Sequence, residues 1–334
     1  MSLTATPLAP AFSARQGWMA VALFLGVGFL WMLFGVWPAW LEWLLIGKKT
    51  FVSAILNGVT LAGLYFLVAS GFTLVFGLMR NVNLAHGSLF LLGAYIGWVV
   101  GDATDNWFLA IAAGFASAAL VGFLLQVSVF RFMQGQELRQ TMVTIGISIV
   151  LADLMLWCFG GEIYSFDPPR AIFQTMPMVV VGKYPAYRLV VLGIAIAVGL
   201  VLWLFLNRTK VGMMIRAGVD DRQMLAASGV NVQRVFAITF AIGAGLAGLA
   251  GVIGGTALSI SPGEDTRYLM ASLVVVIVGG MGSIPGAAVG ALLIGLAEQF
   301  GLSYAPTYGV VFTFLIMVLV LAFRPTGILG RRST

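Results

Sequence analysis

Charge and cysteine are both scarce in this sequence. Charged residues make up 9% of its 334 residues and hydrophobic residues make up 60%, whereas about a quarter of the residues in a soluble domain are charged. This composition excludes a soluble enzyme, a disordered tail protein and a disulfide scaffold. The single cysteine, Cys158, excludes an internal disulfide and a metal site built from several thiolates.

Motifs for nucleotide binding and catalysis are also missing. The segment Gly47-Lys48-Lys49-Thr50 lacks the leading glycine of a P-loop, so the chain cannot bind ATP in that way. No His, Cys and Asp residues have the spacing of metal ligands, no G-x-S-x-G occurs, and no paired carboxylates lie on one apolar run. We therefore expect no catalytic residue, no metal and no cofactor, and we do not expect an enzyme.

Long apolar runs predict an all-α fold, a polytopic transmembrane helix bundle. A spanning helix needs about 20 apolar residues, and seven runs of this kind occupy residues 18–40, 51–76, 84–100, 107–130, 141–159, 186–206 and 235–258. The run 268–300 is too long for one ordinary span, and GGMGSIPG interrupts it at 279–286. We expect a broken hairpin of two shortened helices there, and a last helix at 308–323 brings the count to about 10 spans.

The chain is expected to divide into three parts. Residues 1–49 form an amino-terminal extension with one extra transmembrane helix, residues 50–330 form the core, and residues 331–334 form a cytoplasmic tail. The first apolar run is longer than an ordinary signal-peptide core, and no small-x-small cleavage site follows it. We therefore expect a retained anchor rather than a cleaved signal peptide.

The distribution of charge predicts the orientation, because Lys and Arg concentrate in short cytoplasmic loops. Alternating loops place twelve Lys and Arg on one side and six on the other, whereas seven acidic residues lie on the second side and three on the first. Both termini are therefore expected to be cytoplasmic. The net charge of +6 reflects this topology, and we expect no nucleic-acid partner.

Two loops are long enough to carry function. The outer loop 160–187 holds four prolines, which suits either a surface segment or a docking surface.

In the inner loop 207–234, Asp220 is expected to cap a helix of about two turns that stops at Gly229. This helix could pack on its own bundle or enter a groove on a partner. One face is expected to carry Met224 and Leu225, and Arg222, Gln223 and Ala226 are expected to point away.

Polar residues inside the apolar runs are candidates for a translocation path, although hydrogen bonding between helices is their commoner use. The lone histidine, His86, is more often structural than functional in such a position. Asp153 and Glu298 are the acids within spans, and neither has a basic partner nearby in sequence. Small residues at every fourth position, Gly243, Ala247, Gly251 and Gly255, predict tight helix crossings. The path candidates are Asn57, Thr60, Asn83, His86, Thr144 and Ser148.

Ordered motifs between residues 51 and 330 make the sequence similar to a known family. They are LNGVTL at 56–61, GFTLVFG at 71–77, NLAHGS at 83–88, RAGVDD at 216–221, VGGMGSIPGA at 278–287 and FRPTG at 323–327. The sequence resembles LivH-type permeases, which are membrane subunits of ABC importers for branched-chain amino acids and related small polar solutes.

The resemblance implies a bacterial inner-membrane importer with several subunits. Its partners would be a second, LivM-type permease, two cytoplasmic ATPase subunits, a periplasmic substrate-binding protein and the lipid membrane. A cytoplasmic coupling helix would contact the ATPase, although the segment departs from the E-A-A-x-x-x-G motif by lacking the Glu. The residues of this segment are Asp220, Asp221, Arg222, Met224, Leu225, Ala227 and Gly229.

A stand-alone, ion-coupled secondary transporter or channel is the alternative function. Such proteins bind ions at broken helices near the membrane midplane, but the break at 279–286 is expected to face the cytoplasm. The sequence leaves the substrate open among branched-chain amino acids, urea, amides and aromatic acids.

Overall fold

The fold is almost entirely helical in the part of the chain that the structure describes. The structure is a computed structural model that describes residues 37–79, 82–133, 135–165, 168–178 and 182–330. The chain divides into two compact units, Met1–Val52 and Ser53–Thr334, and the sites discussed below lie in the second unit. Most of the predicted first span, 18–40, lies outside the described residues.

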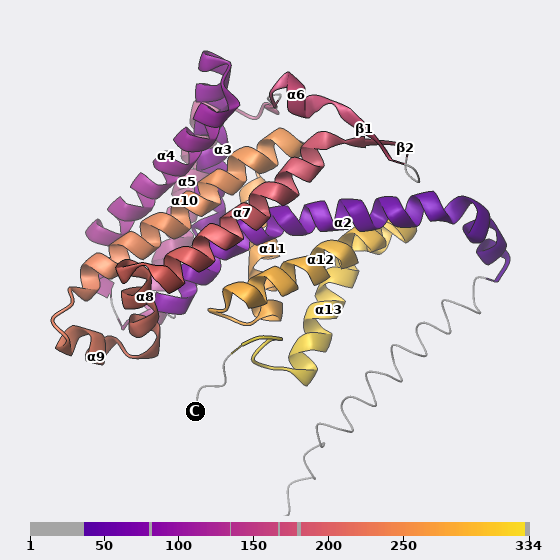
Figure 1. Ribbon diagram of the computed structural model, residues 1–334. Helices are drawn as coiled ribbons and strands as arrows, with labels where there is room; N and C mark the ends of the chain where they lie inside the picture. The colour runs from indigo at the N-terminus through magenta and orange to yellow at the C-terminus, as the bar shows by residue number, and fades with distance from the viewer. Residues whose placement is uncertain (1–36, 80–81, 134, 166–167, 179–181, 331–334) are drawn as a thin grey trace, which may run out of the picture. The chain divides into compact units, whose positions relative to one another are not determined.

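Among the described residues, seven helices are long and apolar enough to cross a membrane. The helices of the bundle follow one another along the chain and are labelled in Figure 1. They are α2 (Trp37–Met79), α3 (His86–Thr104), α4 (Trp107–Ser128), α5 (Glu137–Phe159), α7 (Ala186–Arg208), α10 (Val232–Leu258), α11 (Glu264–Gly279), α12 (Ile284–Tyr304) and α13 (Gly309–Phe323). Of these, α11 and α13 are shorter than the seven candidate spans.

Short elements connect the spans. The single turns are η1 (Phe130–Met133), α6 (Arg170–Phe173) and η2 (Pro306–Tyr308), and two amphipathic helices, α8 (Lys210–Asp220) and α9 (Arg222–Ala227), follow α7. An antiparallel hairpin of β1 (Thr175–Met178) and β2 (Gly182–Pro185) pairs Met176 with Tyr184. The loop 160–187 therefore contains defined secondary structure.

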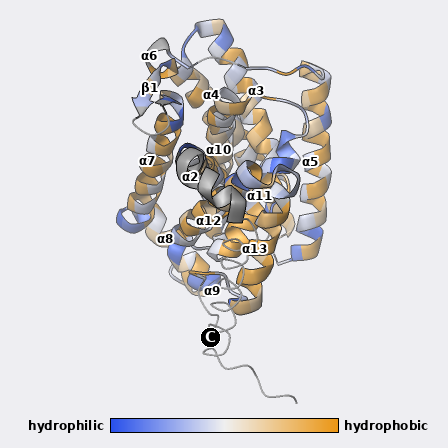
Figure 2. Ribbon diagram, turned by 90° about the vertical axis from the view of Figure 1, so that its right-hand side faces the viewer, coloured by the Kyte–Doolittle hydropathy of each residue, from blue (hydrophilic) through white to orange (hydrophobic). Residues whose placement is uncertain are grey.

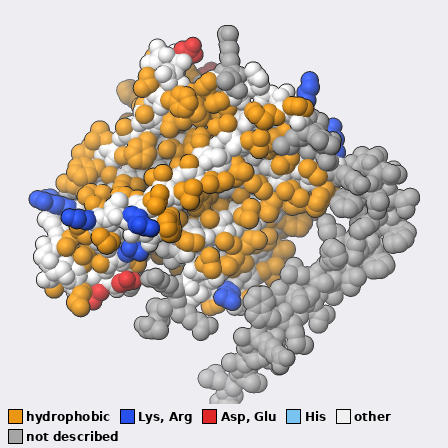
Figure 3. Space-filling model, in the orientation of Figure 1, with side chains coloured by type: hydrophobic (Ala, Val, Ile, Leu, Met, Phe, Trp, Pro, Cys, Tyr) orange, Lys and Arg blue, Asp and Glu red, His pale blue; other side chains and the backbone are white. Residues whose placement is uncertain are grey.

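Helix α10 lies at the centre of the bundle, and α5 lies at its periphery. In the most apolar window of each helix, 78% of α10 is buried against 11% of α5. Glycine explains how α10 packs so closely, because a side chain at Gly93 of α3 would overlap the backbone of Gly248 of α10. Hydrophobic residues run along the outer helices in Figure 2 and cover most of the face seen in Figure 3, as a lipid-facing surface requires.

The connections between helices gather at two ends of the bundle. At the α5–α7 end, Trp107 Nε1 donates to Thr256 Oγ1 at 3.1 Å, and Tyr164 pairs with Ile260. These contacts join the α3–α4, α5–α7 and α10–α11 connections. At the α8–α9 end, the chain after α13 returns to the α11–α12 turn, where Leu329 N donates to Gly279 O at 2.9 Å.

The break in the long apolar run lies between α11 and α12. Gly280 and Gly282 have φ angles of 111° and 80°, a left-handed conformation that glycine adopts without steric cost. Ser283 then caps α12, because its Oγ accepts from Gly286 N at 3.1 Å.

Two predicted loop segments are helical. Residues 41–50, expected between the first two spans, belong to α2, because they contain Leu, Glu and Lys without proline. The inner loop 207–234 holds two helices instead of one, since Thr209 Oγ1 accepts from Gly212 N at 3.0 Å and starts α8 directly after α7.

Candidate functional site

The α8–α9 segment is the first candidate site. Asp221 has extended φ and ψ angles, and its Oδ1 accepts from Gln223 N at 2.8 Å and from Met224 N at 3.0 Å. The N-cap of α9 is therefore Asp221, and the prediction of Asp220 was wrong by one residue because α8 continues through Asp220. The stop at Gly229 is confirmed by its φ of +78°.

The predicted faces of this helix were wrong for Met224 and Arg222, whereas Gln223 and Ala226 are exposed as expected. Leu225 is buried with 6% of its surface exposed, whereas Met224 is 69% exposed. Arg222, expected to point away, donates from a guanidinium nitrogen to Leu78 O at 2.6 Å and lies 5.0 Å from the centre of the Phe236 ring. Because Leu78 lies in the last turn of α2, Arg222 satisfies a carbonyl that the helix leaves open and complements the negative end of its dipole.

The opposite side of α9 forms an exposed surface. We call it the α9 surface. Its large apolar side chain is Met224, and methionine is common at surfaces that bind partners because it adapts its shape. The other members are small or polar, so a partner can approach the helix closely. The α9 surface consists of Gln223, Met224, Ala226, Ala227 and Ser228.

Two path candidates on α2 face the α5–α7 end. Asn57 Oδ1 accepts a hydrogen bond from the guanidinium of Arg188. The hydroxyl groups of Thr60 and Tyr184 lie 3.1 Å apart. Both residues therefore bind side chains from β2 and the start of α7.

The other four path candidates lie around the start of α3. Thr144 Oγ1 accepts from Leu84 N at 3.1 Å, and the hydroxyl groups of Ser148 and Ser88 lie 2.8 Å apart. These bonds fasten α5 to α3, which is the interhelical role that the sequence left open. Asn83 and His86, at the start of α3, are buried.

His86 is enclosed by α2. Its Nε2 lies 3.0 Å from Val68 O, and its ring meets Phe72 edge to face at a centroid distance of 5.4 Å. None of its surface is exposed. The six path candidates thus form two groups, and no hydrogen bond between the groups is found in the described part of the chain.

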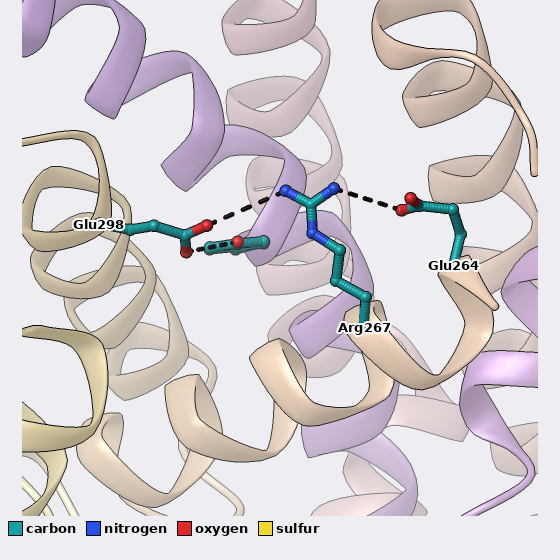
Figure 4. A network of polar contacts seen from close by, with 4 residues as sticks. Glu264, Arg267 and Glu298 are labelled. Atoms are coloured by element: carbon teal, nitrogen blue, oxygen red, sulfur yellow. Dashed lines mark hydrogen bonds and ion pairs between the residues drawn. The ribbon is translucent and has the colours of Figure 1, made fainter. Parts of the chain in front are cut away.

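A charged network near the α5–α7 end was missed by sequence reasoning. Arg267 lies 3.5 Å from Glu264 and 4.0 Å from Glu298, and Tyr65 donates a 2.6 Å hydrogen bond to Glu298 (Figure 4). Glu298 therefore has a basic partner, but that partner is distant in sequence. The only available signal was that both residues lie at the same end of the α11–α12 hairpin.

Removing the Tyr65 hydroxyl should destabilise the protein. Tyr65 is 2% exposed, so Tyr65→Phe removes a buried hydrogen bond to a carboxylate, which is worth about 1.5–3 kcal/mol. We expect a lower melting temperature of the purified protein in detergent. Tyr308→Phe, at a residue that is 60% exposed, is the matched control. Equal melting temperatures for the two variants would contradict a stabilising role for this bond.

The fold and these sites define a class of protein. It is a polytopic α-helical membrane protein that presents a short exposed helix at one end and carries no P-loop of its own. These features are typical of the membrane-spanning subunit of a transporter whose energy source is a separate protein.

Comparison with known proteins identifies the family. Residues 54–321 match the model of the branched-chain amino acid transport system permease component. The permease protein BraD of Pseudomonas aeruginosa is 33% identical over 84% of this chain and 96% of its own length. LivH of Escherichia coli K12 is 31% identical over the same shares. The chain belongs to this permease family.

Family membership settles the class of function. The chain is a permease subunit of an ABC importer in the inner membrane, and it is not an enzyme. Such a subunit works with ATPase and substrate-binding partners, so the alternative of a stand-alone transporter does not apply. No solved structure matches this chain.

Proposed function

We propose that this permease carries branched-chain amino acids or related small polar solutes, driven by ATPases that bind the α9 surface. BraD and LivH are both named as permeases of high-affinity branched-chain amino acid transport. The observation that carries the coupling role is the exposure of Met224 on a helix anchored to the bundle by Leu225 and Arg222.

The proposed topology has ten crossings and places both termini in the cytoplasm. The seven candidate spans, α11, α13 and the apolar run 18–40 make up the ten. The α8–α9 end would face the cytoplasm, because its connections are rich in basic residues. These include Arg131, Arg139, Arg208, Lys210, Arg216 and Arg234.

Three kinds of protein partner are part of this proposal. A LivM-type permease would complete the membrane pathway, two ATPases would bind from the cytoplasm, and a periplasmic binding protein would deliver substrate to the α5–α7 end. The coupling segment would comprise Asp220, Asp221, Arg222, Met224, Leu225, Ala227 and Gly229. Among these residues, Leu225 and Arg222 would hold the helix and Met224 would contact the ATPase.

The contacts of Arg222 suggest how force reaches the membrane. Closure of the ATPases would move α9, and the bond from Arg222 to Leu78 O would pass that movement to α2. Helix α2 carries Asn57, Thr60 and Tyr65, so its displacement would change the polar contacts at the other end. The bundle would then alternate between inward-open and outward-open packings.

The translocation path itself is a proposal for the six polar candidates, Asn57, Thr60, Asn83, His86, Thr144 and Ser148. Asn57 and Thr60 would meet a solute near the α5–α7 end, where Arg267 is half exposed. His86 and Thr144 are fully buried, so they would take part only if α3 and α5 separate during transport.

Cysteine labelling tests the orientation. In a Cys158→Ser background, Lys183→Cys should react with a membrane-impermeant maleimide added to intact cells, because it lies at the outer end. Ser228→Cys, on the α9 surface, should react only after the cells are permeabilised. Labelling of Ser228→Cys in intact cells would overturn both the topology and the coupling role. Uptake of leucine that requires the ATPase subunits would support the proposed function.

A further inference from the structure

A small cavity lies between α3, α5 and the start of α11. Its volume is about 220 Å³, room for several waters at roughly 30 Å³ each or for one solute of amino-acid size. It lies at the α5–α7 end, because Pro262 and Gly263 in its wall lie two and three residues after Ile260. We call it the outer cavity. It is lined by Leu91, Tyr95, Ala152, Asp153, Met155, Leu156, Pro262, Gly263, Asp265 and Thr266.

Two carboxylates and an unpartnered hydroxyl face this cavity. Asp153 comes from α5 and is exposed, so the cavity is open on that side, whereas Asp265 comes from the first turn of α11 and is buried, with 7% of its surface exposed. Only 1% of the Tyr95 surface is exposed, and its buried hydroxyl has no hydrogen-bond partner in the described part of the chain. Tyr95 cannot swing away to find a partner, since its ring stacks on Phe159 at a centroid distance of 4.4 Å.

The charge in the cavity wall is negative and is not compensated. No Lys, Arg or His lines the cavity, and neither Asp153 nor Asp265 forms an ion pair with a described residue. Acidic residues in membrane helices are costly unless they are paired or face a polar cavity. A cationic group in the cavity would offset this negative charge and would give the Tyr95 hydroxyl a donor.

The number of acceptors favours an ammonium group over a metal ion. An ammonium group has three donors and no acceptor, and Asp153, Asp265 and Tyr95 offer three acceptors. A Ca²⁺ ion takes about 6–8 oxygen ligands, and no cluster of three or more acidic, His or Cys residues exists among the described residues.

The remaining walls suit the rest of an aliphatic amino acid. Leu91, Ala152, Met155 and Leu156 offer an apolar surface for a branched side chain. The Thr266 hydroxyl and the first-turn amides of the 16-residue helix α11 offer donors to a carboxylate. One cavity thus presents each of the three surfaces that such a molecule requires.

We propose that the outer cavity binds a zwitterionic aliphatic amino acid, with its ammonium group on Asp153, Asp265 and Tyr95. The inference rests on the proposed function and deepens it, because it assigns a substrate site within the permease. The site recognises the ammonium group of the solute, and its apolar walls accept any of the branched side chains.

Binding of radiolabelled leucine tests the site directly. The assembled transporter in nanodiscs, without the binding protein, is compared as wild type, Asp153→Asn, Tyr95→Phe and Asp102→Asn. Asp102 is an exposed acid at the same end of the bundle and serves as the control. We expect Asp153→Asn to weaken leucine binding about tenfold, equivalent to about 1.4 kcal/mol. Tyr95→Phe should weaken it less, and Asp102→Asn should bind as wild type does.

A competitor without the ammonium group separates the alternatives. For the wild type, 2-hydroxy-4-methylpentanoate should displace leucine poorly, and replacing K⁺ by Na⁺ should leave leucine binding unchanged. Equal binding by Asp153→Asn and Asp102→Asn, displacement by the hydroxy acid, or displacement by Na⁺ would overturn the inference. ATP-driven leucine uptake by the wild type with its binding protein is measured in parallel, because its absence would instead refute the proposed function.

Discussion

Gly93→Ala is expected to prevent α3 and α10 from packing. The added methyl group would overlap the Cα of Gly248 and lie 2.6 Å from its carbonyl oxygen. Because both obstacles are backbone atoms, no side-chain rotation can relieve the clash. Overpacking costs about 1–3 kcal/mol where side chains can shift, so we expect at least that loss of stability here.

The measurement is the yield of monodisperse protein after extraction, together with its melting temperature. We expect the yield of Gly93→Ala to fall about tenfold or more, in line with about 1.4 kcal/mol per factor of ten. Gly146→Ala in α5 is the matched control, because nothing lies within 4 Å of the added group. It should match the wild type or gain up to about 1 kcal/mol from its higher helix propensity. Equal losses for the two variants would show that the close crossing is not the cause.

Met224→Glu is expected to weaken the coupling of the permease to its ATPases while leaving the protein folded. Met224 is 69% exposed, so a charged side chain costs little in the isolated permease. In a complex, the same charge would be buried against the ATPase, and an unpaired buried charge costs several kcal/mol. We therefore expect ATP-driven uptake to fall more than tenfold with a normal yield of permease.

Met213→Glu provides the control for this experiment. Met213 is a 49% exposed methionine on α8, outside the α9 surface. Its replacement adds the same charge near the same end of the bundle, and uptake should remain at the wild-type level. Normal uptake by Met224→Glu would contradict the coupling role of the α9 surface. Leu225 is less suited to this test, because its side chain packs against Gly218 within the bundle.

The helices of the membrane core were predictable because their signal is local. Burying a backbone in lipid requires a helix, so an apolar run such as 235–258 predicts α10 (Val232–Leu258) with small errors at its ends. The same holds for the glycine-rich turn between α11 and α12. The position of a cap was harder to predict, since Asp220 and Asp221 are equally suitable by composition and only the extension of α8 decides between them.

The sequence by itself determined the helical membrane fold, the family and the lack of a P-loop, because these follow from composition and from contiguous motifs. Only the tertiary structure decided which side chains meet. It brought Arg267 to Glu298, turned Arg222 inward onto Leu78, and placed Asp153 beside Asp265 and Tyr95. The physical reason is that a contact between helices depends on how each is rotated and tilted against its neighbours, and residues far apart along the chain carry no local record of that packing.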